Sequence, residues 1–170
     1  MRVARDCTVI GPENVHFGDD VRVDSGTAII ATQGTLTLEG CNHIGGHNHL
    51  AVVTDLSFGI YSGTSQGVRI YTASDDLSGR QSARLKKAAD LPGVTIRPVE
   101  IARFVGIGAS AVVLPGCHIR EGSVVGALSL VNRALRPWGV YHGNPVRRIS
   151  DRPRDLCDVI HAVRVRLGAE

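Results

Sequence analysis

The chain has 170 residues, of which 43% are hydrophobic and 21% are charged, and its formal net charge is +3. These proportions are typical of a folded domain and exclude a chain that is disordered throughout. No stretch approaches the roughly 20 apolar residues of a membrane-spanning helix, and the N-terminus lacks the apolar core of a signal peptide, so we expect a cytoplasmic protein. The mild positive charge has no interleaved aromatic residues and does not indicate nucleic-acid binding.

Glycine is frequent, with 20 residues, whereas aromatic residues make up only 4% of the chain. This composition favours short strands joined by tight turns around an aliphatic core. The four cysteines lie far apart and show no CxxC spacing, which argues against a disulfide framework and against a structural zinc site. They are Cys7, Cys41, Cys117 and Cys157.

Apolar residues recur at every sixth position over most of the chain, with a slip of two residues between Leu50 and Phe58. A period of six fits neither an amphipathic helix nor simple strand alternation. It is typical of stacked coils in which each repeat contributes one inward side chain to a continuous column. The sequence therefore predicts an all-β fold, a parallel β-helix. The expected inward residues are Phe17, Val23 and Ile29; Leu38, Ile44 and Leu50; Phe58, Thr64 and Ile70; and Ile101, Ile107, Val113, Ile119, Val125 and Val131.

Two segments interrupt or follow the repeat. Residues 75–98 lose the period and predict a long loop insertion, which in a compact domain is usually functional. A second break begins at Asn132. Residues 153–170 then predict a C-terminal α-helix, with Pro153 in its first turn and apolar residues on one face. We therefore expect a β-helix domain over residues 1–152 and a helix that packs against its open end.

Two stretches carry motifs of a known family. Residues 105–149 read VGIGASAVVLPGCHIREGSVVGALSLVNRALRPWGVYHGNPVRRI, and residues 58–79 read FGIYSGTSQGVRIYTASDDLSG. The first resembles the end of the left-handed β-helix acyltransferases of the hexapeptide-repeat family. The second is similar to a subgroup of sugar O- and N-acetyltransferases. The resemblance implies left-handed coils, a homotrimer with active sites between subunits, acetyl-CoA as co-substrate, and a sugar or nucleotide-linked sugar whose hydroxyl or amine accepts the acetyl group.

Acetyl transfer needs a base within hydrogen-bond reach of the acceptor proton. Three histidines lie close together in the sequence, and His49 matches a histidine that many members of the subgroup carry before an apolar residue. His47 is the second candidate for the base and His43 the third, and each has the alternative interpretation of a wall residue. Galactoside-type relatives carry their catalytic histidine where this chain has Asp75 and Asp76. These carboxylates would orient a histidine or bind the acceptor, and an Asx turn is the alternative.

The same resemblance places the cofactor and the acceptor. Its cofactor-binding residues here are Gly126, Ala127, Ser129, Asn144, Pro145 and Arg147, with small residues beside the pantetheine arm and arginine beside phosphates. For the acceptor we expect Arg80, in the basic insertion, to attract a diphosphate, together with Asp75 and Asp76. Trp138 is expected either to stack on the acceptor or to pack the end of the prism.

Two other functions use the same fold. A zinc hydratase of the γ-carbonic-anhydrase kind would use three histidines, here His43, His47 and His49, although neighbouring corner residues seldom face one metal. A β-helix without catalytic activity, serving as a scaffold, is the second alternative. The expectation from the resemblance is a CoA-dependent acetyltransferase without a metal.

Overall fold

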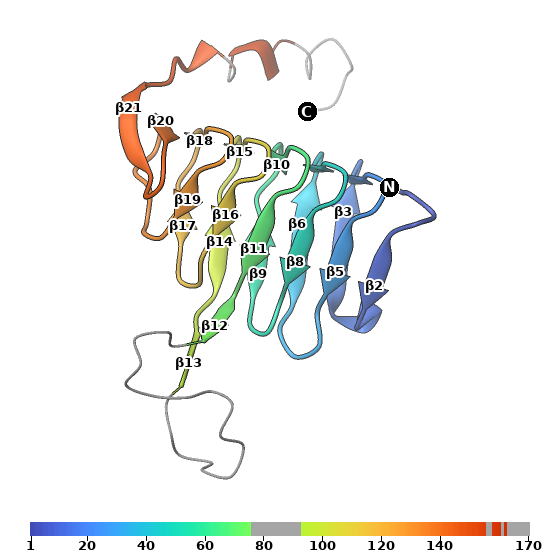
Figure 1. Cartoon of the computed structure of the whole chain (residues 1–170). Coiled ribbons are helices and arrows are strands. Elements are labelled where there is room, and N and C mark those ends of the chain that lie inside the picture. Colours follow the sequence, from blue (N-terminus) through green and yellow to red (C-terminus); the bar gives the residue numbers. More distant parts are fainter. Residues whose placement is uncertain (76–92, 156–157, 161, 163–170) are drawn as a thin grey trace.

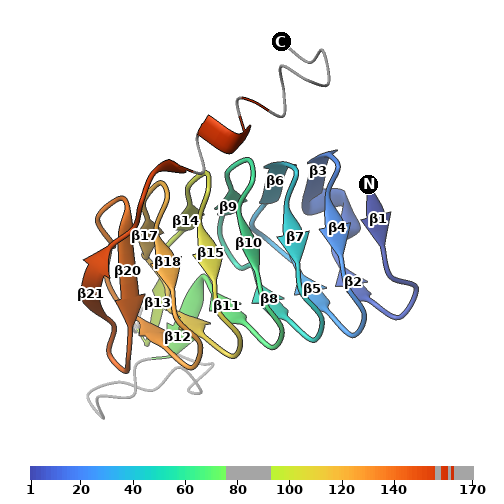
Figure 2. The same ribbon diagram turned by 90° about the horizontal axis from the view of Figure 1, so that it is seen from above.

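The protein is a left-handed parallel β-helix, as the resemblance implies, and its three sheets wind into a triangular prism (Figures 1 and 2). The computed structural model describes residues 1–75, 93–155, 158–160 and 162. Sheet A contains β1 (Arg2–Val3), β4 (Arg22–Val23), β7 (His43–Ile44), β10 (Gly63–Thr64), β15 (Gly106–Ile107), β18 (Val124–Val125), β20 (Gly139–His142) and β21 (Arg147–Asp151). Sheet B contains β2 (Thr8–Ile10), β5 (Ala28–Ile30), β8 (His49–Ala51), β11 (Arg69–Tyr71), β16 (Val112–Val113) and β19 (Leu130–Val131). Sheet C contains β3 (Val15–Asp19), β6 (Leu36–Gly40), β9 (Leu56–Phe58), β14 (Val99–Ile101) and β17 (His118–Ile119).

Each sheet contributes one column of inward side chains, because identical positions of successive coils pair in register. In sheet B, for example, Ile29 pairs with Leu50 and Leu50 with Ile70. Every residue of the six-residue period is inward: Phe17 is partly buried in the first coil, and the others are at most 4% exposed. Coils stacked at the inter-strand spacing of about 4.8 Å thus form a narrow aliphatic core, in agreement with the scarcity of aromatic residues.

A second buried position lies two residues before each inward residue. It holds aliphatic side chains in some coils and small polar ones in others. The polar members are Thr27, Asn42, Asn48, Ser62, Ser123 and Ser129, each at most 2% exposed. The side chains of Thr27, Asn42, Asn48 and Ser123 hydrogen-bond to carbonyls of the next coil, and those of Ser62 and Ser129 to carbonyls of their own coil, so the prism contains a polar ladder beside its aliphatic columns.

Only one of the three corners varies in length. The inward residues of sheets A and B are always six positions apart, as are those of sheets C and A, for example Ile44 to Leu50 and Phe58 to Thr64. Between sheets B and C, which meet at what we call the B–C corner, the interval is eight residues from Leu50 to Phe58. The slip that the sequence shows at this place is a longer corner.

The insertion leaves the prism at the B–C corner of the fourth coil. Its first and last described residues form an antiparallel ribbon, β12 (Ala73–Asp75) with β13 (Val94–Ile96). Residues 76–92 of the expected loop lie outside the described residues. Of the expected C-terminal helix, Asp155, Asp158–Ile160 and Ala162 are helical, and the remainder is likewise outside them. The domain boundaries therefore stay a prediction.

The other two corners hold non-glycine residues in the left-handed backbone region. At the corner between sheets A and B, the A–B corner, these are His47, Ser110 and Leu128. At the corner between sheets C and A, the C–A corner, they are Asp20, Cys41, Tyr61, Phe104 and Trp138. Such a backbone is costly for residues other than glycine and is often found at functional sites.

The chain closes the last coil by reversing direction. Strand β21 runs antiparallel to β20, and Arg152 then donates hydrogen bonds to the carbonyl oxygens of Phe104 (2.8 Å) and Gly122 (3.0 Å). Among the residues that the structure describes, no helix has the length and apolarity needed to cross a membrane.

Candidate active site

The outer face of sheet B carries His49, the first candidate for the base. His49 points outward from β8, is half-buried, and lies beside Arg69 of the next coil. Its ring centroid is 5.8 Å from that of Tyr71. Tyr71 also lines a pocket of about 360 Å³ with Ser74 and Asp75, where the insertion leaves the prism. The structure therefore brings His49 and Asp75 to the same part of the surface, on either side of Tyr71. We call His49, Tyr71, Ser74 and Asp75 the sheet-B site.

The sheet-B site offers two proton acceptors. Within the described residues, neither the imidazole of His49 nor the carboxylate of Asp75 is engaged in a side-chain hydrogen bond. Asp75 is exposed on the antiparallel ribbon, whereas His49 sits on a rigid strand. In the part of the chain that the structure describes, both groups are thus unpaired and able to meet a substrate.

His47 lies elsewhere, at the A–B corner, where it is exposed and has a φ of 57°. Its ring covers Gly26 of the preceding coil, and a Cβ added at Gly26 would lie 2.3 Å from Nδ1 of His47. His47 and His49 are thus separated by the turn into sheet B, although they are only two residues apart in the sequence. Asp76 and Arg80, which the sequence analysis also proposed, lie outside the described residues.

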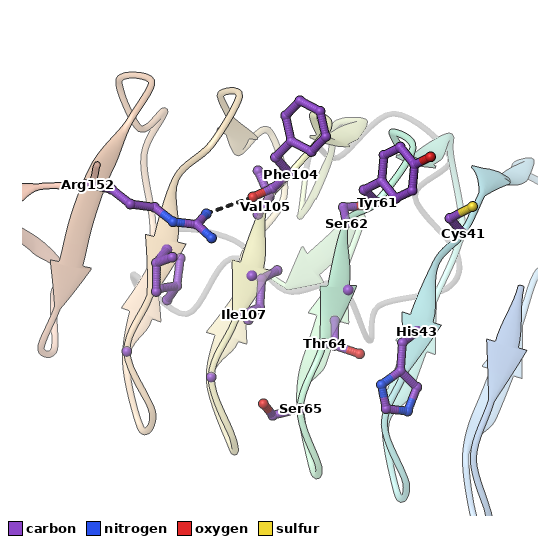
Figure 3. Close-up of a pocket in the computed structure, with 16 residues that line it drawn as sticks. Cys41, His43, Tyr61, Ser62, Thr64, Ser65, Phe104, Val105, Ile107 and Arg152 are labelled. Carbon is purple, nitrogen blue, oxygen red and sulfur yellow. Dashed lines mark hydrogen bonds between the residues drawn. The ribbon is translucent and has the colours of Figure 1, made fainter. Parts of the chain in front are cut away.

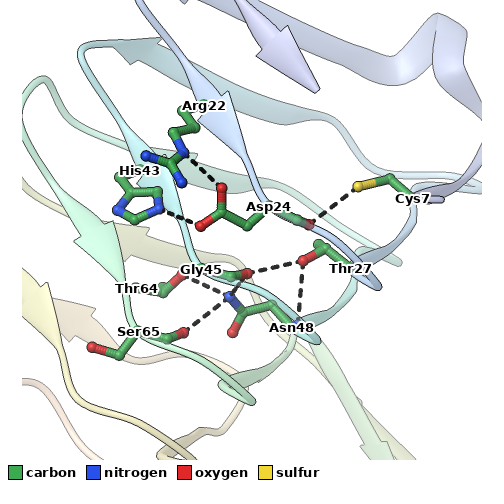
Figure 4. A network of polar contacts seen from close by, with 9 residues as sticks. All are labelled: Cys7, Arg22, Asp24, Thr27, His43, Gly45, Asn48, Thr64 and Ser65. Atoms are coloured by element: carbon green, nitrogen blue, oxygen red, sulfur yellow. Dashed lines mark hydrogen bonds and ion pairs between the residues drawn. The ribbon is translucent and has the colours of Figure 1, made fainter. Parts of the chain in front are cut away.

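His43 lies apart from both of the other histidines, on the outer face of sheet A. It lines a groove of about 560 Å³ there (Figure 3). Its Nε2 is 2.7 Å from Oδ2 of Asp24, and the other carboxylate oxygen of Asp24 is 2.6 Å from Nε of Arg22 (Figure 4). The hydrogen bond with His43 holds the pKa of Asp24 below its usual range, against a smaller opposing effect of desolvation and with help from Arg22.

Asp24 is a residue that the sequence analysis missed. An imidazole held by a carboxylate has the geometry of an oriented base or hydrogen-bonding group. The sequence feature that could have revealed the contact between Asp24 and His43 is the coil repeat. It places Arg22 and His43 in register at adjacent outward positions of sheet A, and Asp24 lies two residues after Arg22. We call the surface around Gly63 and Gly106, with His43 on one side, the sheet-A groove.

The residues proposed for the cofactor gather at the A–B corner of the last coils. Gly126 donates its amide to the carbonyl of Tyr141 (2.7 Å), and Ser129 Oγ accepts a hydrogen bond from the amide of Gly143 (3.1 Å). The segment with Asn144 and Pro145, both exposed, therefore lies directly beside the segment with Gly126, Ala127 and Ser129. Arg147 follows in β21 and is exposed. The A–B corner of the last coils therefore presents exposed backbone, with the cationic side chain of Arg147 nearby.

Trp138 packs at the C–A corner and is only 8% exposed. Its ring covers Gly122, where an added Cβ would lie 2.4 Å from the indole. The Phe104 ring lies 6.4 Å away, and the guanidinium of Arg154 lies 5.4 Å from the indole centroid. Little of the indole is left for an acceptor, so the structure agrees with the packing alternative.

The described residues contain no group of three or more His, Cys, Asp or Glu side chains arranged to hold a metal. His43, His47 and His49 lie on sheet A, on the A–B corner and on sheet B. Within one chain, the three histidines therefore do not provide the donor set that the zinc alternative needs.

Comparison with known proteins found no matching family model. The dTDP-4-amino-4,6-dideoxy-D-glucose acyltransferase of Escherichia coli is 24% identical over 159 residues, which is 94% of this chain and 83% of that protein. A chloramphenicol acetyltransferase of Klebsiella aerogenes is 40% identical over 55 residues, only 32% of this chain and 26% of that protein.

Solved structures extend the likeness to nearly the whole fold. AntD, an N-acyltransferase from Bacillus cereus in complex with dTDP and 3-hydroxybutyryl-CoA, superposes with a TM-score of 0.90 at 24% identity, covering 98% of this chain and 87% of that one. A serine variant of AntD, in complex with dTDP-4-amino-4,6-dideoxyglucose and coenzyme A, has a TM-score of 0.88 at 25% identity, covering 95% and 85%. A maltose O-acetyltransferase from Clostridium difficile 630 has a TM-score of 0.60 at 23% identity, covering 90% and 67%.

Proposed function

We propose that this chain, a member of the hexapeptide-repeat acyltransferases, transfers an acyl group from acyl-coenzyme A to the amine of a nucleotide-linked amino sugar. The observation that carries the proposal is the likeness along almost the whole chain to two acyltransferases whose names or complexes specify a dTDP-linked 4-amino sugar. The match to chloramphenicol and maltose acetyltransferases is shorter or structurally weaker and adds only the reaction class.

The reaction requires the neutral amine to attack the thioester carbonyl. The nitrogen becomes positively charged as the new amide bond forms, and it must lose a proton before the thiolate of coenzyme A leaves. Because the attacking nitrogen is positively charged and acidic at that stage, a carboxylate as well as an imidazole can accept its proton. We place this transfer at the sheet-B site, where Asp75 and His49 both lie.

A spacing in AntD supports Asp75. Variants of AntD crystallised with dTDP and coenzyme A carry changes at a serine and at an aspartate ten positions further along that chain. In this chain, ten positions separate Ser65 from Asp75. Ser65 is exposed at the A–B corner and Asp75 lies beyond the B–C corner of the same coil, at opposite edges of sheet B.

Because the two residues lie at opposite edges of sheet B, we infer that a single site that uses both draws them from two copies of the chain. This arrangement supports the homotrimer that the family resemblance implies, with each site at a seam between subunits. The gathered residues of the A–B corner, including Gly126, Ala127 and Ser129, would then hold the pantetheine arm at the same seam. Arg147 would meet the phosphates of coenzyme A.

The test is a thiol-release assay with acetyl-CoA and 3-hydroxybutyryl-CoA as donors and dTDP-4-amino-4,6-dideoxyglucose as acceptor. We expect turnover that requires the amino sugar and that falls at least about 100-fold in Asp75→Asn or in His49→Gln, the typical effect of removing a general base. His43→Gln is the matched control, because it removes an imidazole from the other face. Absence of turnover with this acceptor and with a panel of amino sugars would refute the function.

Mixing variants tests the seam. Ser65→Ala and Asp75→Asn chains, each inactive as a homo-oligomer, should regain activity when co-expressed. In about a quarter of the seams of random trimers, the Asp75→Asn chain supplies an intact Ser65 and the Ser65→Ala chain supplies an intact Asp75. If differently tagged chains co-purify as mixed trimers and activity still does not recover, both residues lie in one subunit's site or outside the site.

A further inference from the structure

Formal charge is distributed unevenly along the prism, whose coils follow one another from β1 at one end to β20 and β21 at the other (Figure 1). Residues 1–55, in the first three coils, contain three arginines and seven acidic residues. Residues 93–154, in the last coils, contain nine arginines and three acidic residues. The prism is therefore negative toward its N-terminal end and positive toward its C-terminal end, although the formal net charge of the whole chain is only +3.

Most of the positive charge lies at the C-terminal end of the prism. Residues 132–154 contain six arginines and one acidic residue, Asp151. Four of these arginines surround one hollow of about 450 Å³, namely Arg133, Arg136, Arg147 and Arg148. The apolar floor of the hollow is formed by Leu135, Tyr141 and Val146, which are the last members of the buried core in chain order. We call the four arginines and this hollow the basic end.

The charge of the basic end is not neutralised within the described part of the chain. Arg133, Arg136 and Arg147 are exposed and form no ion pair with any described residue. Only Arg148 has an acidic partner there, Asp151, at 2.6 Å. Like charges that gather around one hollow repel one another, so this arrangement favours an anionic partner.

Two features of the basic end favour an anionic lipid surface over a nucleic acid. Guanidinium groups bind phosphate bidentately, and an apolar floor beneath them suits the boundary between phosphate headgroups and acyl chains. In addition, the aliphatic side chain of Ile149, next to Arg148 in β21, is 65% exposed. The interface of a bilayer accommodates such a side chain, whereas the sugar-phosphate backbone of a nucleic acid offers it no apolar contact.

We propose that the basic end docks the protein on an anionic phospholipid surface, with the acidic N-terminal end directed away from that surface. The docking needs neither acyl-coenzyme A nor a sugar, so it is independent of the acyl transfer proposed above. Arg147 is also assigned to the phosphates of coenzyme A. Arg133 and Arg136, which lie between β19 and β20, have no part in the proposed acyl transfer, and they are therefore the residues to change.

The test is co-sedimentation of the full-length protein with lipid vesicles, without acyl donor or sugar. We expect binding to vesicles of equimolar phosphatidylcholine and phosphatidylglycerol and none to vesicles of phosphatidylcholine alone. Raising sodium chloride from about 0.1 M to about 1 M should abolish the binding, because the Debye length falls from about 10 Å to about 3 Å. The double variant Arg133→Gln and Arg136→Gln should bind at least about tenfold more weakly, since each basic residue at an anionic surface strengthens binding about fivefold.

The double variant should keep the Tm of the wild-type protein, because neither arginine side chain has a hydrogen bond among the described residues. The matched control is Arg2→Gln with Arg5→Gln, which removes two exposed arginines at the opposite end of the prism. This control should bind the mixed vesicles as well as the wild-type protein does.

Three results would overturn the proposal. One is no binding of the wild-type protein to the mixed vesicles. Another is equal weakening in the two double variants, which would make the attraction an effect of net charge and not of the basic end. The third is tighter binding of the wild-type protein to double-stranded DNA than to the mixed vesicles at the same salt concentration, which would make the basic end a nucleic-acid surface.

Discussion

Two buried threonines of the same network should respond in opposite directions to the same substitution. Asn48 Nδ2 has two protons but three acceptors within reach: the carbonyl oxygen of Gly45 (2.5 Å), Thr64 Oγ1 (3.0 Å) and the carbonyl oxygen of Ser65 (3.1 Å). The Thr64 hydroxyl donates to no acceptor among the described residues. Thr64→Val therefore removes a surplus acceptor and an unpaired buried donor.

Thr27, shown in the same network in Figure 4, differs. Its hydroxyl donates to the carbonyl oxygen of Gly45 (2.9 Å) and accepts the backbone amide of Asn48 (3.3 Å), which has no other partner in the described part of the chain. Thr27→Val leaves that buried N–H unpaired, at a cost of about 1–3 kcal/mol. Thr64→Val should instead raise the free energy of unfolding by about 1 kcal/mol, because an unpaired buried hydroxyl is exchanged for a methyl group.

The measurement is urea unfolding of both variants and the wild-type protein at one protein concentration, with m-values compared to confirm like transitions. The contrast in sign is the essential result, since both side chains are at most 4% exposed and the substitution is the same. If Thr64→Val destabilises the protein as much as Thr27→Val, the assignment of a surplus acceptor to Asn48 is wrong.

Three further predictions concern the core and its titrating groups. Leu50→Ala, at a fully buried inward position, should lower the free energy of unfolding by about 3–5 kcal/mol. Val112→Ala, at an outward position, should lower it by about 1 kcal/mol or less. Equal losses in urea unfolding would contradict the inward position of Leu50. Burial raises the pKa of the Cys117 thiol to about 11, so at pH 8 it should resist a disulfide reagent until the protein is unfolded, and prompt labelling in the native state would count against its burial. The hydrogen bond from His43 lowers the pKa of Asp24, so the pair stabilises the fold, by at most about 1 kcal/mol for a surface pair. This stabilisation is present above pH 4 and is lost as the pH falls through the folded-state pKa of Asp24. Asp24→Asn should flatten the loss of stability in acid, and an unchanged acid profile would argue against the pair.

The inward columns could be predicted from the sequence because each side chain in them obeys one period. Even Thr64, a polar residue in an aliphatic series, lies between Ile44 and Ile107 as the period requires. The hand of the coils could not be predicted this way, since a period of six is the same for either hand. It came only from the resemblance.

The candidate site could be predicted only in part. His43, His47 and His49 look like one cluster in the sequence, but the turn between sheets A and B sends the first and last to different faces. Asp24 lies a whole coil before His43, so its ion pair depends on stacking register rather than on local spacing. The segments expected to bind the cofactor lie side by side because consecutive A–B corners stack directly on one another, and their role toward the cofactor stays a prediction.

The variable B–C corner suggests how such a protein can change its substrate. Extra residues there add only loop-closure entropy, which grows slowly with length, and they leave every inward position of the prism in register. Because β12 and β13 bring the two ends of the insertion together, a segment of another length or composition can be exchanged between Asp75 and Val94. Selectivity can thus diverge at one edge of the molecule while the scaffold is inherited intact.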